Sequence, residues 1–231
     1  MAGFEQIAAV ILVGISLLAG RQAFQALSFI SHNKKDTVLK KVFFWAAIGI
    51  IAWVAGDFID FILGKYPSIA DAFFIVGYAV MLPAMIFFWI YNSNKLTSRE
   101  YMLFLFAIFV VMALTVIMLF LVVMPNKNEK ELIEIALDFF YPVGSAILFL
   151  STFSITAVVD RKVKQERKNL PLLYLAQGIF FSFLGDVFFS FSTWKGVYGV
   201  LGGISDISYI LSYALFAFSF YLFRKSQYLK S

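Results

Sequence analysis

Seven long apolar stretches constrain this chain of 231 residues more than any other feature. An α-helix needs about 20 mostly apolar residues to cross the hydrocarbon core of a bilayer, and each stretch meets that length. Because the stretches are continuously apolar rather than alternating, they predict helices and not the strands of a membrane barrel. The first stretch is too long for a signal peptide and lacks a small-residue cleavage site, so we expect it to span the membrane. The seven predicted spans are residues 5–30, 42–64, 69–93, 101–124, 132–158, 170–192 and 200–223.

Composition agrees with this assignment. Hydrophobic residues make up 61% of the chain and charged residues 14%, whereas soluble domains typically have about 45–50% and about 25%. The longest connection, residues 159–169, is too short to hold a soluble domain. We therefore expect residues 1–231 to form a single all-α, multi-pass transmembrane domain with seven helices.

The basic residues predict the orientation of the spans. Most of the 19 Lys and Arg residues fall in the first, third and fifth connections and in the C-terminal tail. Short cytoplasmic loops carry an excess of Lys and Arg. We therefore expect the N-terminus outside and the C-terminus in the cytoplasm. The opposite side holds only Lys65, Lys127, Lys130 and Lys195.

Several classes of function are excluded by residue usage. The chain has no cysteine and a single histidine, His32, which excludes a disulfide framework, a thiol nucleophile and a multi-histidine zinc site. The net charge of +5 lies in loops between apolar spans and not in a basic patch mixed with surface aromatics, so no nucleic-acid partner is expected. No lysine lies inside a span to form a Schiff base, which excludes retinal. No organic cofactor is predicted.

An internal repeat is visible at the scale of helical hairpins. Residues 71–79, 138–146 and 206–214 each begin with an Asp. In each segment an aromatic residue follows the Asp by three positions, Gly or Ser by six, and Ala by eight. Gly-Asp pairs at 56–57 and 185–186 occur in the spans before the first and third of these segments. All three segments begin spans that run from outside to inside, which indicates parallel repeats. We expect three hairpins, formed by spans 2–3, 4–5 and 6–7, with the first span added.

Acidic side chains within the spans point to a functional site, because each costs a few kcal/mol or more at the bilayer centre. All of them fall in the predicted outer half. Asp71 and Tyr78 share one helix face because they are two turns apart. Tyr209 and Tyr213 share a face with Asp206 in the same way. This arrangement predicts an outward-facing acidic pocket with the ligand-binding residues Asp57, Asp71, Asp138, Asp186, Asp206, Tyr78, Tyr209 and Tyr213.

Helix capping is the alternative role for some of these carboxylates. Ser68 and Asp71 have the spacing of a capping box, and Asp206 follows a serine at an expected helix start. Capping does not explain Asp57 or Asp186, which lie near helix C-terminal ends, where a negative charge opposes the dipole. Carboxylates that converge need shared protons, a divalent cation held by oxygen ligands, or a cationic or hydroxylated ligand.

An ordered series of motifs suggests a family. It consists of Gly56-Asp57, residues 66–78, residues 140–144, Gly185-Asp186 and residues 206–213. The series resembles the multi-span membrane sensory domain found N-terminal to prokaryotic diguanylate cyclases and sensor histidine kinases. The resemblance covers spans 2 to 7 and implies sensing of a membrane-borne or extracellular signal in a prokaryotic plasma membrane. No effector follows span 7 in this sequence, so we expect membrane lipid and a separate signalling protein as partners.

A second, more local resemblance concerns residues 178–186 and 202–209. They are similar to lysoplasmalogenases, which are membrane hydrolases of vinyl-ether lysolipids. This resemblance implies an intramembrane hydrolase, with Asp57 and Asp186 as candidate catalytic acid and base. Where that family has His-x-x-Tyr, this chain has Asp206-x-x-Tyr209, which removes the natural proton shuttle near pH 7. A sensing or binding module without enzymatic activity is therefore our first expectation, and the lysolipid hydrolase is the alternative.

Overall fold

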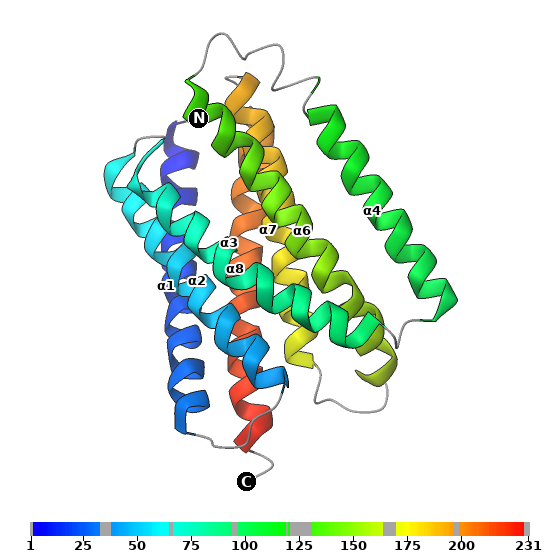
Figure 1. Ribbon diagram of the computed structural model, residues 1–231. Coiled ribbons are helices and arrows are strands. Elements are labelled where there is room, and N and C mark those ends of the chain that lie inside the picture. The colour runs from blue at the N-terminus through cyan, green and yellow to red at the C-terminus, as the bar shows by residue number, and fades with distance from the viewer. Residues whose placement is uncertain are drawn as a thin grey trace.

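The computed structural model describes residues 2–32, 38–64, 67–93, 97–118, 120, 131–163, 170–195 and 199–228. These residues contain no strand, which agrees with the predicted all-α fold. Figure 1 shows the helices arranged as one elongated bundle, with the two termini at opposite ends. The seven helices of the described residues are α1 (Ala2–His32), α2 (Val38–Leu63), α3 (Ile69–Ser93), α4 (Ser98–Met118), α6 (Leu132–Val163), α7 (Leu170–Lys195) and α8 (Gly199–Tyr228).

Six of these helices are long and apolar enough to cross a membrane. This confirms a multi-pass helical membrane protein. Helix α4 is not among the six over its described residues, and most of 119–124, where the fourth predicted span ends, lies outside the described residues. The six span-capable segments are Gln6–His32, Val38–Leu63, Ile69–Ile86, Leu132–Thr152, Leu170–Ser192 and Gly199–Ser226.

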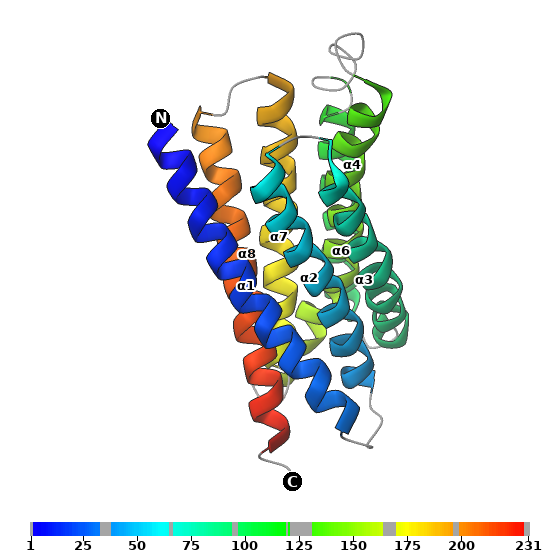
Figure 2. The same cartoon turned by 90° about the vertical axis from the view of Figure 1, so that its left-hand side faces the viewer.

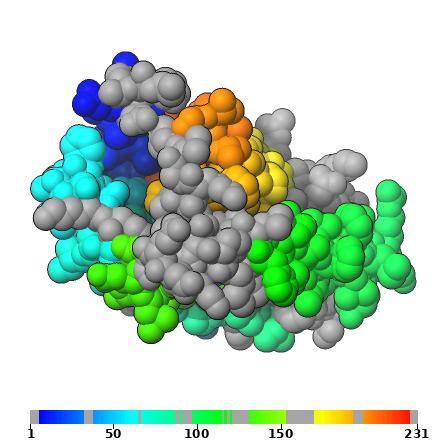
Figure 3. Space-filling view, turned by 90° about the horizontal axis from the view of Figure 1, so that it is seen from above, coloured from blue at the N-terminus to red at the C-terminus, as the bar shows by residue number. Residues whose placement is uncertain are grey.

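The six span-capable helices form a closed ring. Each helix packs against the next in the order α1, α2, α3, α6, α7 and α8, and α8 packs back against α1. Two perpendicular views show this arrangement (Figures 1 and 2). Helix α4 lies outside the ring against α6, and from above its side chains project from the side of the molecule away from α1 (Figure 3). Helix α1, which corresponds to the span added to the three predicted hairpins, is part of the ring, and α4 is the peripheral helix.

Side-chain size explains why α1 and not α4 enters the ring. Ala19, Ala23 and Ala26 of α1 are completely buried, and such small residues let membrane helices approach closely. Helix α4 contains no glycine and leaves Phe106 and Phe109 more than 60% exposed. Its bulky surface favours contact with lipid over close packing on several neighbours.

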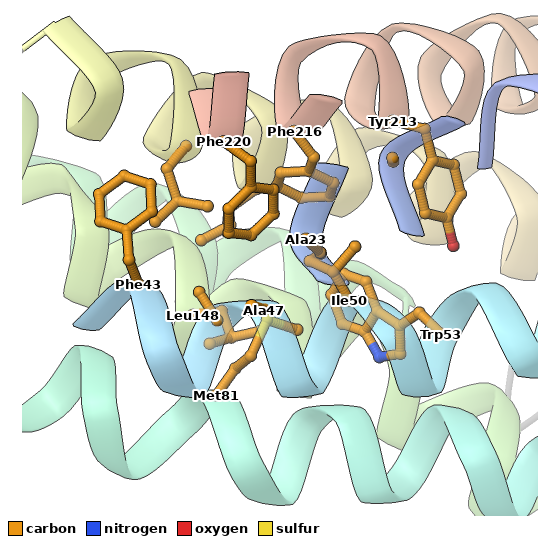
Figure 4. Close-up of a cluster of buried hydrophobic side chains, with 14 of the residues drawn as sticks. Ala23, Phe43, Ala47, Ile50, Trp53, Met81, Leu148, Tyr213, Phe216 and Phe220 are labelled. Atoms are coloured by element: carbon orange, nitrogen blue, oxygen red, sulfur yellow. The ribbon is translucent and has the colours of Figure 1, made fainter. Parts of the chain in front are cut away.

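Large apolar side chains fill the ring below its acidic half (Figure 4). At the end that carries the C-terminus, Phe43 of α2 stacks on Phe223 of α8, with ring centroids 4.2 Å apart. Ile50 and Phe216 are completely buried further along the same two helices. Trp53, one turn beyond Ile50 on α2, is also buried and lies at the end of this core that faces the acidic half.

Candidate functional site

Asp186 of α7 is the centre of the most extensive polar cluster described in the ring. Its side chain is 6% exposed. The Tyr78 hydroxyl of α3 donates a hydrogen bond to Oδ2 at 2.6 Å, and the Tyr209 hydroxyl of α8 donates to Oδ1 at 2.6 Å. Ser145 of α6 donates a third hydrogen bond, to Oδ2. One carboxyl group therefore ties α7 to three other helices, and we call these four side chains the Asp186 cluster.

The Asp186 cluster sits directly on the aromatic core. The rings of Tyr78 and Trp53 lie 4.9 Å apart, and the hydroxyls of Tyr78 and Ser145 also hydrogen-bond each other. The Trp53 indole nitrogen donates to the backbone carbonyl of Phe74 at 3.1 Å, which joins α2 to α3. The orientation of Tyr78 is therefore fixed by both apolar and polar neighbours.

Asp71 has two roles at the start of α3. Its Oδ2 accepts a hydrogen bond from the Ser68 backbone N–H at 2.6 Å, and the Ser68 hydroxyl accepts one from the Ala70 N–H at 3.1 Å. This is the capping box that the sequence predicts. Asp71 also accepts a hydrogen bond from the Tyr141 hydroxyl of α6. Because the rings of Tyr141 and Tyr78 lie 6.3 Å apart, Asp71 is connected to the Asp186 cluster through two aromatic side chains.

Asp57 of α2 differs from the other two aspartates because its hydrogen-bonding capacity is not fully used. Its Oδ2 atom is buried and has no hydrogen-bond partner among the described residues. Tyr213 of α8 and Ser16 of α1 interact with the carboxyl group, and Asp60 and Asp186 are near enough to repel it electrostatically. Buried polar atoms are almost always hydrogen-bonded, so an exception needs an explanation. Among the aspartates of the described residues, only Asp57 has a buried oxygen atom that accepts no hydrogen bond.

Two further predicted aspartates lie on the neighbouring helices. Asp138 of α6 is 1% exposed, and its backbone carbonyl accepts a hydrogen bond from Ser190 of α7 at 3.2 Å. Asp206 is half-buried in the first turns of α8. The described hydrogen bonds of the Asp186 carboxyl group come from Tyr78, Ser145 and Tyr209.

Sequence reasoning missed Tyr141 and Ser145 as members of the polar network, although the repeat contains the signal for both. Tyr141 follows Asp138 by three positions, as Tyr209 follows Asp206. Ser145 follows Asp138 by seven positions, as Tyr78 follows Asp71 and Tyr213 follows Asp206. An alignment of the three segments would have pointed to both hydroxyls.

The hairpins α2–α3 and α7–α8 also place equivalent residues in contact. A Cβ atom added to Gly56 would lie 2.7 Å from the Phe74 ring, and one added to Gly185 would lie 2.6 Å from the Tyr209 ring. In both hairpins the glycine of the Gly-Asp pair makes room for an aromatic ring. That ring belongs to the residue three positions after the aspartate that begins the repeated segment of the next helix. The position of each aspartate therefore depends on the same close helix approach.

The chemistry of the site is that of hydroxyl and carboxyl oxygens. In the ranges that the structure describes, no three His, Cys, Asp or Glu side chains are grouped so that they could hold a metal ion. Asp186 already accepts three hydrogen bonds of the roughly four that a carboxylate can accept, whereas Asp57 retains an unused oxygen. The arrangement leaves one buried carboxyl oxygen of Asp57 able to accept a further hydrogen bond.

Comparisons with known proteins add no relative to this picture. No protein-family model, no curated protein and no solved structure matches the chain.

Proposed function

We propose that the protein is an integral membrane sensing or ligand-binding module. Its ligand occupies an acidic pocket that lies beside Asp57 and opens to the outside. The observation that carries this proposal is the buried Oδ2 of Asp57, which has no partner among the described residues. An unsatisfied buried polar atom destabilises a protein by about 1–3 kcal/mol. A ligand that donates a hydrogen bond removes this penalty on binding.

The Asp186 cluster supports the proposal by holding the neighbouring side chains in place. Three hydroxyl groups from three helices fix Asp186, and Asp186 acts electrostatically on Asp57. A negative field at Asp57 favours a cationic or hydroxyl-bearing ligand over an anionic one. A divalent cation is the alternative ligand, in which case water would supply the oxygen ligands that the described side chains do not.

The proposed topology has seven spans, with α4 as the fourth, an outside N-terminus and a cytoplasmic C-terminus. The excess of Lys and Arg in the first, third and fifth connections supports it. The equivalent contacts of Gly56 and Gly185 support the parallel hairpin repeat. In this topology the acidic site lies in the outer half, and a separate signalling protein would receive the output at the inner side.

Binding is favoured over transport by the apolar core below the site. Phe43, Phe216 and Phe220 are completely buried inside the ring and belong to one continuous hydrophobic cluster. An ion or proton pathway would need polar groups to continue past this point.

One test needs no ligand. It compares the effects of substituting Asp57 and Asp186 on the free energy of unfolding of the purified protein. Asp57→Leu removes the buried oxygen that lacks a partner, but it also takes the carboxyl group away from Tyr213 and Ser16, so the free energy of unfolding should change by less than about 1 kcal/mol. Asp186→Leu should lower it by about 2 kcal/mol or more, because three hydroxyl groups lose their acceptor. Both are measured by thermal or denaturant unfolding in detergent micelles. If Asp57→Leu destabilises the protein as strongly as Asp186→Leu, Asp57 is structural and the proposed pocket is wrong.

Ligand class is tested with Asp57→Asn and its control Glu131→Gln, which removes an acidic group at an exposed position just before α6. Ethanolamine, choline, glycerol and Mg²⁺ serve as probes. A class of ligand that binds should raise the unfolding temperature of the wild type and of Glu131→Gln but not that of Asp57→Asn. Equal shifts in all three proteins would exclude a site at Asp57.

A lysolipid hydrolase is the second candidate, because Asp57 and Asp186 are close enough to interact and paired carboxyl groups can act as acid and base. Its test is the release of fatty aldehyde from a vinyl-ether lysolipid. Release by the wild type that is lost in Asp57→Asn would favour the hydrolase over the sensing module.

A further inference from the structure

A groove lies on the surface between α1 and α8, and none of its lining residues belongs to the Asp186 cluster. It has a volume of about 330 Å³, which is at the small end of ligand pockets, about 300–1,000 Å³. Its lining is mostly apolar and includes Ile15 and Leu18 of α1 and Ala217 and Phe218 of α8. Figures 1 and 2 show these two helices in contact along the side of the bundle.

The polar side chains of this groove lie toward the end of the bundle that carries the C-terminus. Gln22 of α1 and Tyr221 of α8 line it there. Gln22 also accepts a hydrogen bond from an Nη atom of Arg224, one turn beyond Tyr221 on α8. The groove therefore leads from an apolar wall to a guanidinium group.

The Arg224 side chain has an unused donor at this point. Its Nε atom is buried and has no hydrogen-bond partner in the parts of the chain that the structure describes. A guanidinium group binds phosphate through Nε and Nη in a planar, two-pronged geometry. The exposed Arg21, next to Gln22 in the sequence, adds a second positive charge on the same helix turn. The unused donor and the two charges favour an anionic partner over a neutral one, and the anionic group of membrane lipids is the headgroup phosphate.

From these observations we infer that the α1–α8 groove binds an anionic phospholipid, with one acyl chain along the apolar wall and the headgroup phosphate hydrogen-bonded by Arg224. The apolar wall and the guanidinium group meet at Gln22, which lines the groove and accepts the hydrogen bond from Arg224. The alanines at 214 and 217 provide the space for the chain. This inference does not depend on the ligand of the acidic site.

The test measures binding of phosphatidylglycerol to the purified full-length protein in detergent, by native mass spectrometry across a lipid titration. Arg224→Gln should weaken the first binding event at least tenfold. Its matched control is Lys225→Gln, the same loss of charge at the same depth on an exposed neighbour, which should change the affinity less than twofold. Glycerol phosphate, which has the phosphate but no acyl chain, should not compete.

A second pair of variants tests the groove itself and protects the result from misfolding. Ala214→Phe fills the groove from an exposed position and should weaken binding as Arg224→Gln does; Ala79→Phe, at an exposed position of α3, should not. Every variant is first checked for an unfolding temperature close to that of the wild type in lipid-free detergent. If Arg224→Gln and Lys225→Gln weaken binding equally, or if Ala214→Phe has no effect, the lipid is held only by diffuse charge and the site does not exist.

Discussion

Gly185→Ala is the most informative single substitution that the structure offers. The added Cβ would lie 2.6 Å from Cε1 of Tyr209, a separation that real Cβ atoms do not tolerate, so the Tyr209 ring must move. That ring carries the hydroxyl group that donates to Asp186 at 2.6 Å. The substitution therefore reaches the Asp186 cluster without altering any of its polar groups.

The expected magnitude follows from three contributions. Overpacking of a well-packed interior costs about 1–3 kcal/mol, and loss of a buried hydrogen bond to a charged group costs about 1.5–3 kcal/mol. Replacing glycine by alanine inside a helix stabilises the folded protein by about 1 kcal/mol, which offsets part of this cost. The sum predicts a destabilisation of about 1.5–5 kcal/mol for Gly185→Ala.

Gly56→Ala is the matched control, because its Cβ would lie 2.7 Å from Phe74, an aromatic ring without a hydroxyl group. Its destabilisation should be only about 0–2 kcal/mol. Gly14→Ala, where nothing lies within 4 Å of the added Cβ, should be neutral or slightly stabilising. All three are measured by unfolding in one detergent, with Tyr209→Phe combined with Gly185→Ala in a double-mutant cycle.

The cycle separates displacement of the hydroxyl from simple crowding. If Gly185→Ala acts by breaking the Tyr209–Asp186 hydrogen bond, adding Tyr209→Phe should cost almost nothing further. Full additivity of the two substitutions, or a Gly185→Ala protein as stable as Gly14→Ala, would refute the reasoning.

Three further substitutions test separate contacts by the same unfolding measurement. Trp53→Phe removes the indole donor to the Phe74 carbonyl and should destabilise by about 1–3 kcal/mol; an unchanged midpoint would show that this bond does not join α2 to α3. Ser219→Ala deletes a completely buried hydroxyl that donates to the Pro171 carbonyl at 2.6 Å and should cost about 0.5–1.5 kcal/mol, so a stabilised variant would contradict it. Gly64→Ala places a side chain at φ +55° in open space and should cost about 1–2 kcal/mol, whereas Gly64→Asn should be better tolerated.

The helices and their approximate limits could be predicted because hydropathy and length determine where a helix can cross a bilayer. The capping box of Ser68 and Asp71 could be predicted for a similar reason, since it depends on residues close in sequence. The peripheral position of α4 could not. An apolar helix is equally compatible with lipid and with protein neighbours, and only the packing of small residues decides between them.

The site was predictable in part for the same physical reason. Asp71 and Tyr78 share a helix face because of the helical period, but Tyr78 hydrogen-bonds Asp186, a residue more than 100 positions away. No period in the sequence links α3 to α7, so the acceptor of Tyr78 could not be inferred. Ser145 was overlooked because a serine in an apolar helix commonly bonds its own backbone, and only its position in the repeat distinguishes it.

The closed ring has a consequence for how the protein is assembled in the cell. Chains are synthesised from the N-terminus, and contacts between distant segments form late. Helix α8 packs against both α1 and α7. Helix α1 therefore has only α2 as a ring neighbour until α8 has been synthesised. Until then Asp186 lacks Tyr209 and Asp57 lacks Tyr213. Nascent chains that stop before α8 should therefore hold these two carboxyl groups with fewer hydrogen-bond partners than the complete ring provides.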